Sequence, residues 1–269
     1  MTRFALPVLA VASLLCCAGG ARPTLPGVDA GPPARFETVV IDAGHGGQDR
    51  GARGVHGLLE KELVLDVAKL LERRLRKRGL RVVMTRDEDE TVSLEARTSI
   101  ANDARADLFL SIHANSARSP KPRGIETYFA SAEASDARAR EVAERENRSF
   151  ASGAALESAD PLVDIIGDMI AAEKMNDSSV FAHLAQAELQ RIEQASPRGV
   201  KQAPFVVLLG VQLPASLIEI GFLSHPQEER TLRTGRRREA IAAALESAVV
   251  AYAAHHDALR GFRDHAQGE

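Results

Sequence analysis

Apolar and polar residues alternate along the chain in two different rhythms from residue 37 onward. Short runs of aliphatic and β-branched residues have the length of strands and are predicted at residues 38–42, 80–85, 107–112, 124–130, 205–209 and 216–220. Segments with apolar residues three or four positions apart are predicted to be helices, at residues 59–78, 94–104 and 236–254. This alternation predicts a single α/β domain in which a mostly parallel or mixed sheet is flanked by helices.

The region from about residue 133 to 196 departs from that alternation. Its periodicity predicts three helices, over residues 135–148, 161–173 and 177–193. A connection of this length with its own helices is too long for an ordinary loop, so we interpret it as a helical insertion in the domain.

The N-terminal residues show no pattern typical of a folded domain. Residues 1–20 combine Arg3, a short apolar stretch and several small residues, which is the layout of a secretory signal peptide. Residues 21–36 are rich in Pro, Gly and Ala, as in a linker. We therefore expect an exported protein of the periplasm or cell envelope, with its folded domain at residues 37–256 and a C-terminal tail at residues 257–269.

Cysteine content and charge narrow the possible partners. The only two cysteines, Cys16 and Cys17, stand where the apolar stretch ends, so the exported domain has no disulfide. Two readings stay open for this pair: a lipid-anchored cysteine, or a signal that is cleaved and lost. A net charge of −3 provides no basic surface to neutralise phosphates, so we exclude a nucleic-acid partner.

Two histidines directly follow or end predicted strands. His45 lies on a glycine-rich turn after the first strand, and His113 lies at the end of the third. Ligands bind at the carboxyl ends of strands in open α/β sheets, and a catalytic zinc uses three protein ligands and one open position. Glu60, at the start of the first helix, is the best candidate for the third ligand. Each of these residues alone also has an ordinary structural explanation as a loop, strand-end or helix-start residue.

Two further carboxylates are candidates for supporting the chemistry. Glu219 lies inside an otherwise apolar strand, where an unpaired charge is costly, so we expect it to face the site and act as a general base. A structural ion pair is the alternative. Asp42 closes the first strand and is expected to orient a ligating histidine, since such ligands commonly donate their second ring N–H to a carboxylate.

Five ordered motifs give the chain a family resemblance: VVIDAGHGGQDRGARG, LLEKELVLDVAKLL, LFLSIHAN, GIETYF and LIEIGFLSHPQEER. Together they resemble the catalytic domain of zinc-dependent N-acetylmuramoyl-L-alanine amidases, the peptidoglycan hydrolases used in daughter-cell separation. The resemblance covers about residues 37–252. One departure is His225, where the family more often has Asn, and we interpret His225 as a turn residue and not as a ligand.

The resemblance implies a six-stranded sheet and one zinc ion. The implied metal ligands are His45, Glu60 and His113, and the implied catalytic residue is Glu219. Asp42 and Asn115 also match the family's motifs, and we expect them to have supporting roles.

The helical insertion is similar to that of the division-associated subgroup, in which a helix covers the zinc and one of its glutamates fills the open metal position. This implies autoinhibition by a lid, which we place at Pro161 to Glu173, with Glu157, Asp164 or Glu173 as the inhibitory carboxylate. A protein activator is then needed to displace the lid helix.

Two other function classes remain as alternatives. One alternative is a metal-free homologue that binds the wall or regulates another protein. The other is a zinc peptidase or deacetylase that acts elsewhere on the same polymer. Metal content and the mass of the released products distinguish these possibilities.

Overall fold

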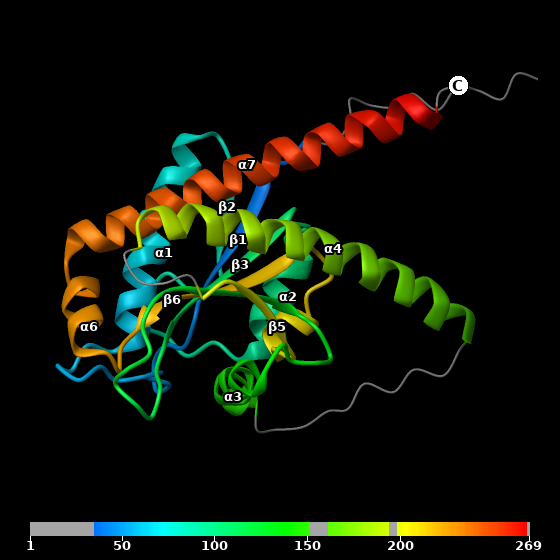
Figure 1. Ribbon diagram of the computed structural model, residues 1–269. Helices are drawn as coiled ribbons and strands as arrows, with labels where there is room; N and C mark the ends of the chain where they lie inside the picture. The colour runs from blue at the N-terminus through cyan, green and yellow to red at the C-terminus, as the bar shows by residue number, and fades with distance from the viewer. Residues whose placement is uncertain (1–34, 151–160, 194–197, 268–269) are drawn as a thin grey trace, which may run out of the picture. The chain divides into compact units, whose positions relative to one another are not determined.

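A mixed six-stranded sheet forms the centre of the protein in a computed structural model that describes residues 35–150, 161–193 and 198–267 (Figure 1). The strands are β1 (Thr38–Ala43), β2 (Arg81–Met84), β3 (Leu108–Asn115), β4 (Glu126–Ala130), β5 (Val200–Ala203) and β6 (Ala215–Phe222). Their order is β2-β1-β3-β6-β4-β5, and every neighbouring pair is parallel except β4 with β6. The predicted α/β class and the implied strand number are therefore confirmed.

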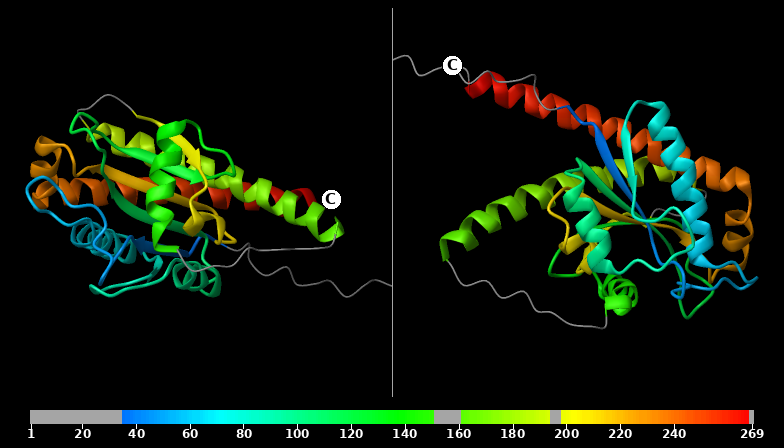
Figure 2. Two further views of the ribbon diagram at one scale, coloured as in Figure 1. Left: turned by 90° about the horizontal axis from the view of Figure 1, so that it is seen from below. Right: turned by 180° about the vertical axis from the view of Figure 1, so that it is seen from behind.

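Helices cover both faces of the sheet (Figures 1 and 2). The helices are α1 (Glu60–Lys77), α2 (Leu94–Asp103), α3 (Ala137–Glu146), α4 (Pro161–Arg191), α5 (Val206–Leu209), α6 (Pro226–Leu232) and α7 (Gly235–Gln267), with a 3-10 turn, η1 (Asn147–Phe150), after α3. Helices α1, α4 and α7 pack against one face, and α2, α3 and α5 against the other. Helix α6 follows β6 at the carboxyl edge of the sheet and joins it to α7.

Strands β1 and β3 are interior strands of the sheet, and apolar residues on both of their faces pack into the core. Val39 and Ile41 pack under α1 and α7, whereas Val40 packs on the opposite face with Phe109. All six residues of β1 and all eight of β3 are buried. Parallel strands covered on both faces read as continuous apolar runs, which explains why the sequence pattern located them.

Helix α1 is positioned by one apolar face. Leu63, Val67 and Leu71 have no exposed surface and lie against the sheet. The helix ends at Lys77, and Gly79 follows with a φ of 85°, a left-handed conformation that glycine adopts without steric cost. The first residue of this helix, Glu60, is thereby fixed at the edge of the sheet.

Three elements differ from the sequence-based prediction. The predicted strand at 205–209 is wrong, because residues Val206–Leu209 form the short helix α5 between Pro204 and Gly210. A short buried apolar run does not by itself distinguish a strand from a helix. The missed strand is β5, whose sequence VKQA lacks apolar alternation and lies at the sheet edge. The two helices predicted at 161–173 and 177–193 are one continuous helix, α4.

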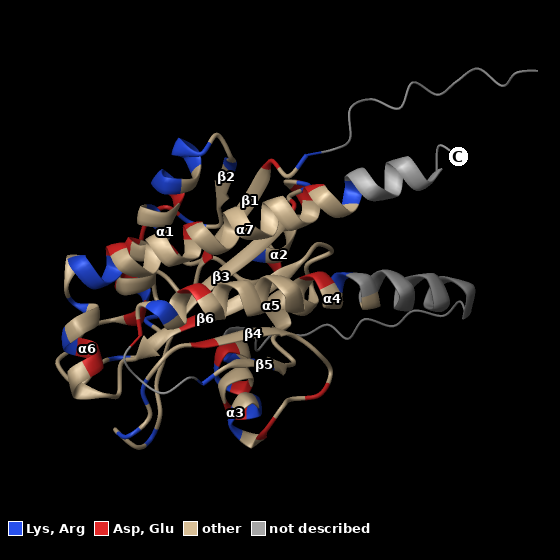
Figure 3. Ribbon diagram, turned by 45° about the horizontal axis from the view of Figure 1, so that its top comes forward, with Lys and Arg blue, Asp and Glu red and all other residues tan. Residues whose placement is uncertain are grey.

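The ends of the chain differ in how far the structure describes them. Helix α7 continues through Gln267 instead of ending near residue 254, so the expected tail is largely helical. The proposed signal and most of the linker, including Cys16 and Cys17, lie outside the described residues. None of the described helices is both long and apolar enough to cross a membrane. Lys and Arg positions cluster at the end of α1 and at the start of α7 (Figure 3).

Candidate metal centre

Four side chains from four different elements converge at the carboxyl edge of the sheet. His45 follows β1, Glu60 opens α1, His113 lies in β3, and Glu146 is the last residue of α3. One nitrogen or oxygen atom from each of these residues lies within 4.8 Å of all the others. The structure thus brings together the three ligands expected from the sequence and adds a fourth, Glu146.

The spacing of these donor atoms suits a small tetrahedral cation. Nε2 of His45 lies 3.0 Å from Oε1 of Glu60 and 3.2 Å from Oε2 of Glu146. Nδ1 of His113 lies 3.2 Å from the same Glu60 oxygen and 3.1 Å from the same Glu146 oxygen. Ligands about 2.0 Å from a tetrahedral zinc are about 3.3 Å apart, so two imidazoles and two carboxylates at these separations fit zinc.

Backbone geometry brings the two imidazole rings close together. Their centroids are 4.9 Å apart, and a Cβ atom on Gly44 would come within 2.4 Å of the His113 ring. His45 itself has a φ of 59°, a left-handed conformation that is uncommon for a residue with a side chain. Such local strain persists where the surrounding structure holds the residue in place.

Hydrogen bonds with neighbouring groups orient the side chains of His45 and Glu60. Nδ1 of His45 lies 2.9 Å from a carboxylate oxygen of Asp49, which leaves Nε2 to face the other three side chains. Glu60 accepts the backbone N–H groups of Ala52 at 2.7 Å and Ala114 at 2.9 Å. These contacts fix the direction in which each donor atom points, as partners of metal ligands commonly do.

Asp42 does not contact either ring, contrary to the expectation that it orients a ligating histidine. Its carboxylate accepts hydrogen bonds from Thr85 at 2.6 Å, Arg97 at 2.6 Å and Ser111 at 2.7 Å. Arg97 in turn donates to the backbone oxygen of His45 at 2.6 Å. Asp42 therefore acts on the histidine turn through Arg97, and the carboxylate at the ring is Asp49, four residues after His45.

Charge balance in the cluster favours ionised carboxylates beside protonated imidazoles. Burial alone would lower the pKa of His113, but Glu146 and Glu60 raise it to about 9. Burial alone would raise the pKa of Glu60, but the two imidazoles hold it below its usual value. A cation that bound here would displace one proton from each imidazolium, because only neutral histidine binds a metal.

Glu219 lies beside this cluster and is completely buried. It stands opposite His113 in the pairing of β6 with β3, and opposite Glu126 in the pairing of β6 with β4. Burial, reinforced by the nearby charge of Glu146, raises the pKa of the Glu219 carboxyl well above its usual value. Nη2 of Arg145 lies 3.5 Å from Oε1 of Glu219. A carboxyl group in such surroundings suits proton transfer.

Asn115 links neighbouring elements next to Glu219 through hydrogen bonds. Its amide nitrogen donates to Glu126 at 3.0 Å, and its Oδ1 accepts from Nη2 of Arg145 at 3.1 Å. Arg145 also donates to the backbone oxygen of Ser116 at 2.5 Å. The side-chain amide of Asn115 therefore joins β3, β4 and α3 beside Glu219.

The structure does not test the carboxylates that the sequence proposed as inhibitory. Glu157 lies outside the described residues, as do the side chains of Asp164 and Glu173. Among the described residues, the carboxylate that reaches the cluster from the insertion is Glu146, at the end of α3. The signal that could have found it is periodicity, because Glu146 shares the buried face of α3 with Ala139, Val142 and Ala143.

The remaining sequence-based assignment concerns His225. His225 lies half-buried in the turn after β6, where its Nδ1 accepts the backbone N–H of Glu228 at 3.2 Å and caps α6. It is a turn residue outside the metal cluster, as the sequence predicted.

The fold and the site define an α/β domain whose parallel strands deliver a buried histidine–carboxylate cluster to one edge. Residues 39–251 match the family described as N-acetylmuramoyl-L-alanine amidase. The chain therefore belongs to the N-acetylmuramoyl-L-alanine amidase family.

Relatives of known sequence and structure agree with this assignment. The chain is 36% identical over 217 residues to the amidase AmiA of Escherichia coli K12, which covers 80% of this chain and 75% of AmiA. It is 35% identical over 235 residues to the amidase AmiC of Escherichia coli O6:H1, covering 86% of this chain and 56% of AmiC. A solved amidase structure from Clostridium difficile 630 superposes with a TM-score of 0.62 at 27% identity, over 81% of this chain and 97% of the other.

Proposed function

We propose that the protein is a zinc-dependent hydrolase of the amide bond between N-acetylmuramic acid and the L-alanine of the peptidoglycan stem peptide. The observation that carries this proposal is the set of His45, Glu60 and His113 donor atoms, which lie at the separations a tetrahedral zinc requires. Zinc would supply Lewis-acid chemistry there, polarising the scissile carbonyl and making a water molecule more acidic.

Glu219 is the residue of this chain that moves the proton. Its carboxylate accepts the proton of the attacking water and returns it to the nitrogen of the departing L-alanine. The full burial of Glu219 beside His113 supports this role. Burial raises the pKa of a carboxyl group, which makes it better able to take up a proton from water and hold it until it is passed on.

We further propose that α3 inhibits the enzyme. Glu146 places an oxygen against both imidazoles, at the position where a fourth ligand would enter, so substrate and Glu146 compete for one place. Arg145 reinforces this arrangement through Asn115, Ser116 and Glu219. The lid expected at Pro161 to Glu173 stays a separate hypothesis, since the side chains at its proposed contact points are not described.

An inhibited resting state implies an activator. A partner protein can shift the equilibrium only if it binds the form with α3 displaced better than the closed form. The exported location, the possible lipid on Cys16 or Cys17 and the role in daughter-cell separation remain proposals that rest on the sequence. Mass determination of the mature N-terminus would distinguish a lipid-anchored chain from a cleaved one.

Digestion of purified peptidoglycan tests the proposed reaction. The zinc-loaded protein is incubated with wall material, with and without a chelator, and the products are identified by mass spectrometry. The proposal predicts intact stem peptides and glycan strands with free lactyl groups, formed only without chelator. Shortened peptides would indicate a peptidase, lost acetate a deacetylase, and binding without any product a wall-binding module. Each of these three results would contradict the proposed reaction.

A further inference from the structure

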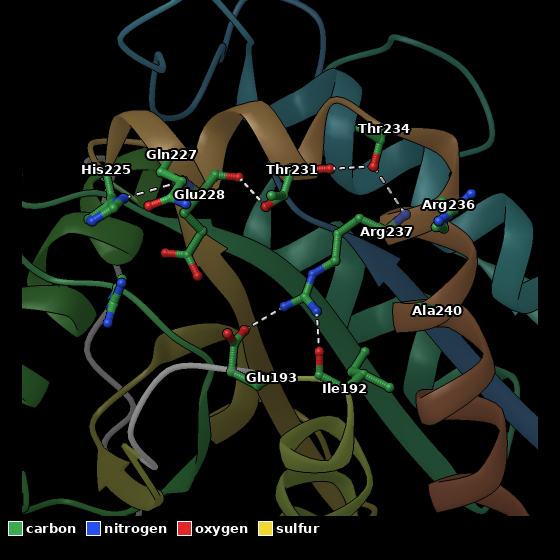
Figure 4. Close-up of a pocket in the computed structure, with 11 residues that line it drawn as sticks. Ile192, Glu193, His225, Gln227, Glu228, Thr231, Thr234, Arg236, Arg237 and Ala240 are labelled. Carbon is green, nitrogen blue, oxygen red and sulfur yellow. Dashed lines mark hydrogen bonds and ion pairs between the residues drawn. The ribbon is translucent and has the colours of Figure 1, made fainter.

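A cavity lies between α6, the start of α7 and the end of α4 (Figure 4). We call it the α6–α7 pocket. Its volume is about 490 Å³, within the range of about 300–1,000 Å³ that is usual for small-molecule sites. The charged and titratable residues of its lining are Arg123, Glu193, His225, Glu228, Arg236 and Arg237. None of them belongs to the metal centre.

The two acids of the lining are already engaged within the protein. Arg237 reaches across the pocket to the carboxylate of Glu193 at 2.5 Å and to the backbone oxygen of Ile192 at 2.7 Å (Figure 4). Glu228 accepts the backbone N–H of Gly124 at 2.9 Å and that of Phe222 at 2.8 Å. Burial raises the pKa of Glu228 to about 7, so this carboxyl carries only part of a negative charge at neutral pH.

Two of the arginines in the lining, Arg123 and Arg236, differ from Arg237 in having no such partner among the described residues. Arg123 and Arg236 are exposed, and no carboxylate in the described part of the chain lies within ion-pair distance of either. His225 accepts a hydrogen bond at Nδ1, so its neutral ring carries the hydrogen on Nε2. The pocket therefore presents donors and positive charge, which is the chemistry that recognises a carboxylate.

The pocket also lies close enough to the metal centre for a bound stem peptide to reach it. Glu228, in its lining, is hydrogen-bonded to the backbone of Phe222, three residues beyond Glu219 on β6. At about 3.3 Å per residue in a strand, this contact is about 10 Å from the proposed base. An extended peptide of four residues spans about 13 Å, so a peptide stem that starts at the metal centre is long enough to reach the pocket.

We propose that the α6–α7 pocket binds a free carboxylate of the peptide stem of the substrate, with Arg123 and Arg236 as its main cationic contacts. This inference rests on the proposed function, because it names the part of the same substrate that the protein recognises. Residues Arg123 and Arg236 are then specificity-determining residues for stems that carry an unmodified carboxylate.

Binding measurements on an inactive protein test this directly. Two synthetic N-acetylmuramoyl tripeptides are compared that differ only in their carboxyl groups, which are all free in one compound and all converted to primary amides in the other. Their affinities for the Glu219→Gln protein are measured by calorimetry. We expect the carboxylate form to bind about tenfold more tightly, as one charge-assisted hydrogen bond supplies. In the Arg123→Ala/Arg236→Ala version of the same protein, this preference disappears.

A double variant at the far end of α1, Arg73→Ala/Lys77→Ala, removes the same charge from exposed positions outside the pocket and should keep the preference. Equal affinities for the two tripeptides, or equal losses in both double variants, would overturn the assignment of the pocket. Because binding is measured without turnover, this outcome is separate from the proposed reaction. That reaction fails only if the active enzyme leaves the N-acetylmuramoyl-L-alanine bond of both compounds intact.

Discussion

Replacement of Glu146 by alanine should activate the enzyme in the absence of any partner protein. Glu146 makes two contacts with the cluster, at 3.2 Å to His45 and 3.1 Å to His113. Its other oxygen holds Arg145 at 2.8 Å. The substitution removes all three contacts and leaves His45, Glu60 and His113 in place to hold the metal.

The size of the effect follows from the contacts that are lost. Charge-assisted contacts contribute about 1.5–3 kcal/mol each, so the contact of Glu146 with Arg145 and the place of its other oxygen at the fourth metal position together stabilise the closed form by about 3–6 kcal/mol. Every 1.4 kcal/mol changes a population about tenfold, so the open fraction should rise by about two orders of magnitude or more. The gain in rate levels off once the open form predominates.

Release of dye from labelled peptidoglycan at equal zinc loading measures this gain. The matched control is Glu144→Ala, which removes an exposed carboxylate from the same helix and should leave the rate unchanged. The reasoning is refuted if the Glu146→Ala protein binds zinc as the unmodified protein does and yet releases dye no faster.

Three further substitutions test the roles assigned to individual residues. Glu219→Gln should lower kcat by about two to four orders of magnitude, the contribution typical of a general base, while the zinc content stays unchanged. If kcat and zinc content fell together, Glu219 would be a metal ligand. Arg97→Met leaves the buried Asp42 carboxylate uncompensated and should lower the free energy of unfolding by about 3–5 kcal/mol in urea titrations, whereas a change below about 1 kcal/mol would contradict the assigned ion pair. The pKa of Glu228 is about 7 in the folded state, above its ordinary value of 4.5, so the folded state stays protonated at pH values where the unfolded state has lost its proton. The free energy of unfolding should therefore fall as the pH rises from 5 to 8, by at most about 3 kcal/mol. In the Glu228→Gln protein this fall should be absent, and equal slopes for the two proteins would exclude Glu228 as its source.

The sequence carried enough information for the central part of the fold. Strands β1, β3 and β6 are fully buried, so their apolar runs were visible, and α1 has one continuous apolar face. His45 and His113 could be placed at one edge because parallel strands end together. Local pattern and topology agree for all of these elements.

The remaining features depend on contacts between distant parts of the chain. Val206–Leu209 is apolar enough for a strand but forms a short helix, and the polar VKQA segment becomes a strand because β4 offers a free edge. Glu146 meets the cluster only because α3 packs against the sheet with its Ala139 face. Asp49 reaches His45 through the conformation of the glycine-rich turn, which spacing alone does not give.

The most direct test of the account is the position of zinc in crystals of the zinc-loaded protein, located by anomalous diffraction at the zinc absorption edge. The account predicts one strong peak within bonding distance of Nε2 of His45, Oε1 of Glu60 and Nδ1 of His113. A peak bound to other residues, or none at this cluster in the loaded protein, would contradict it.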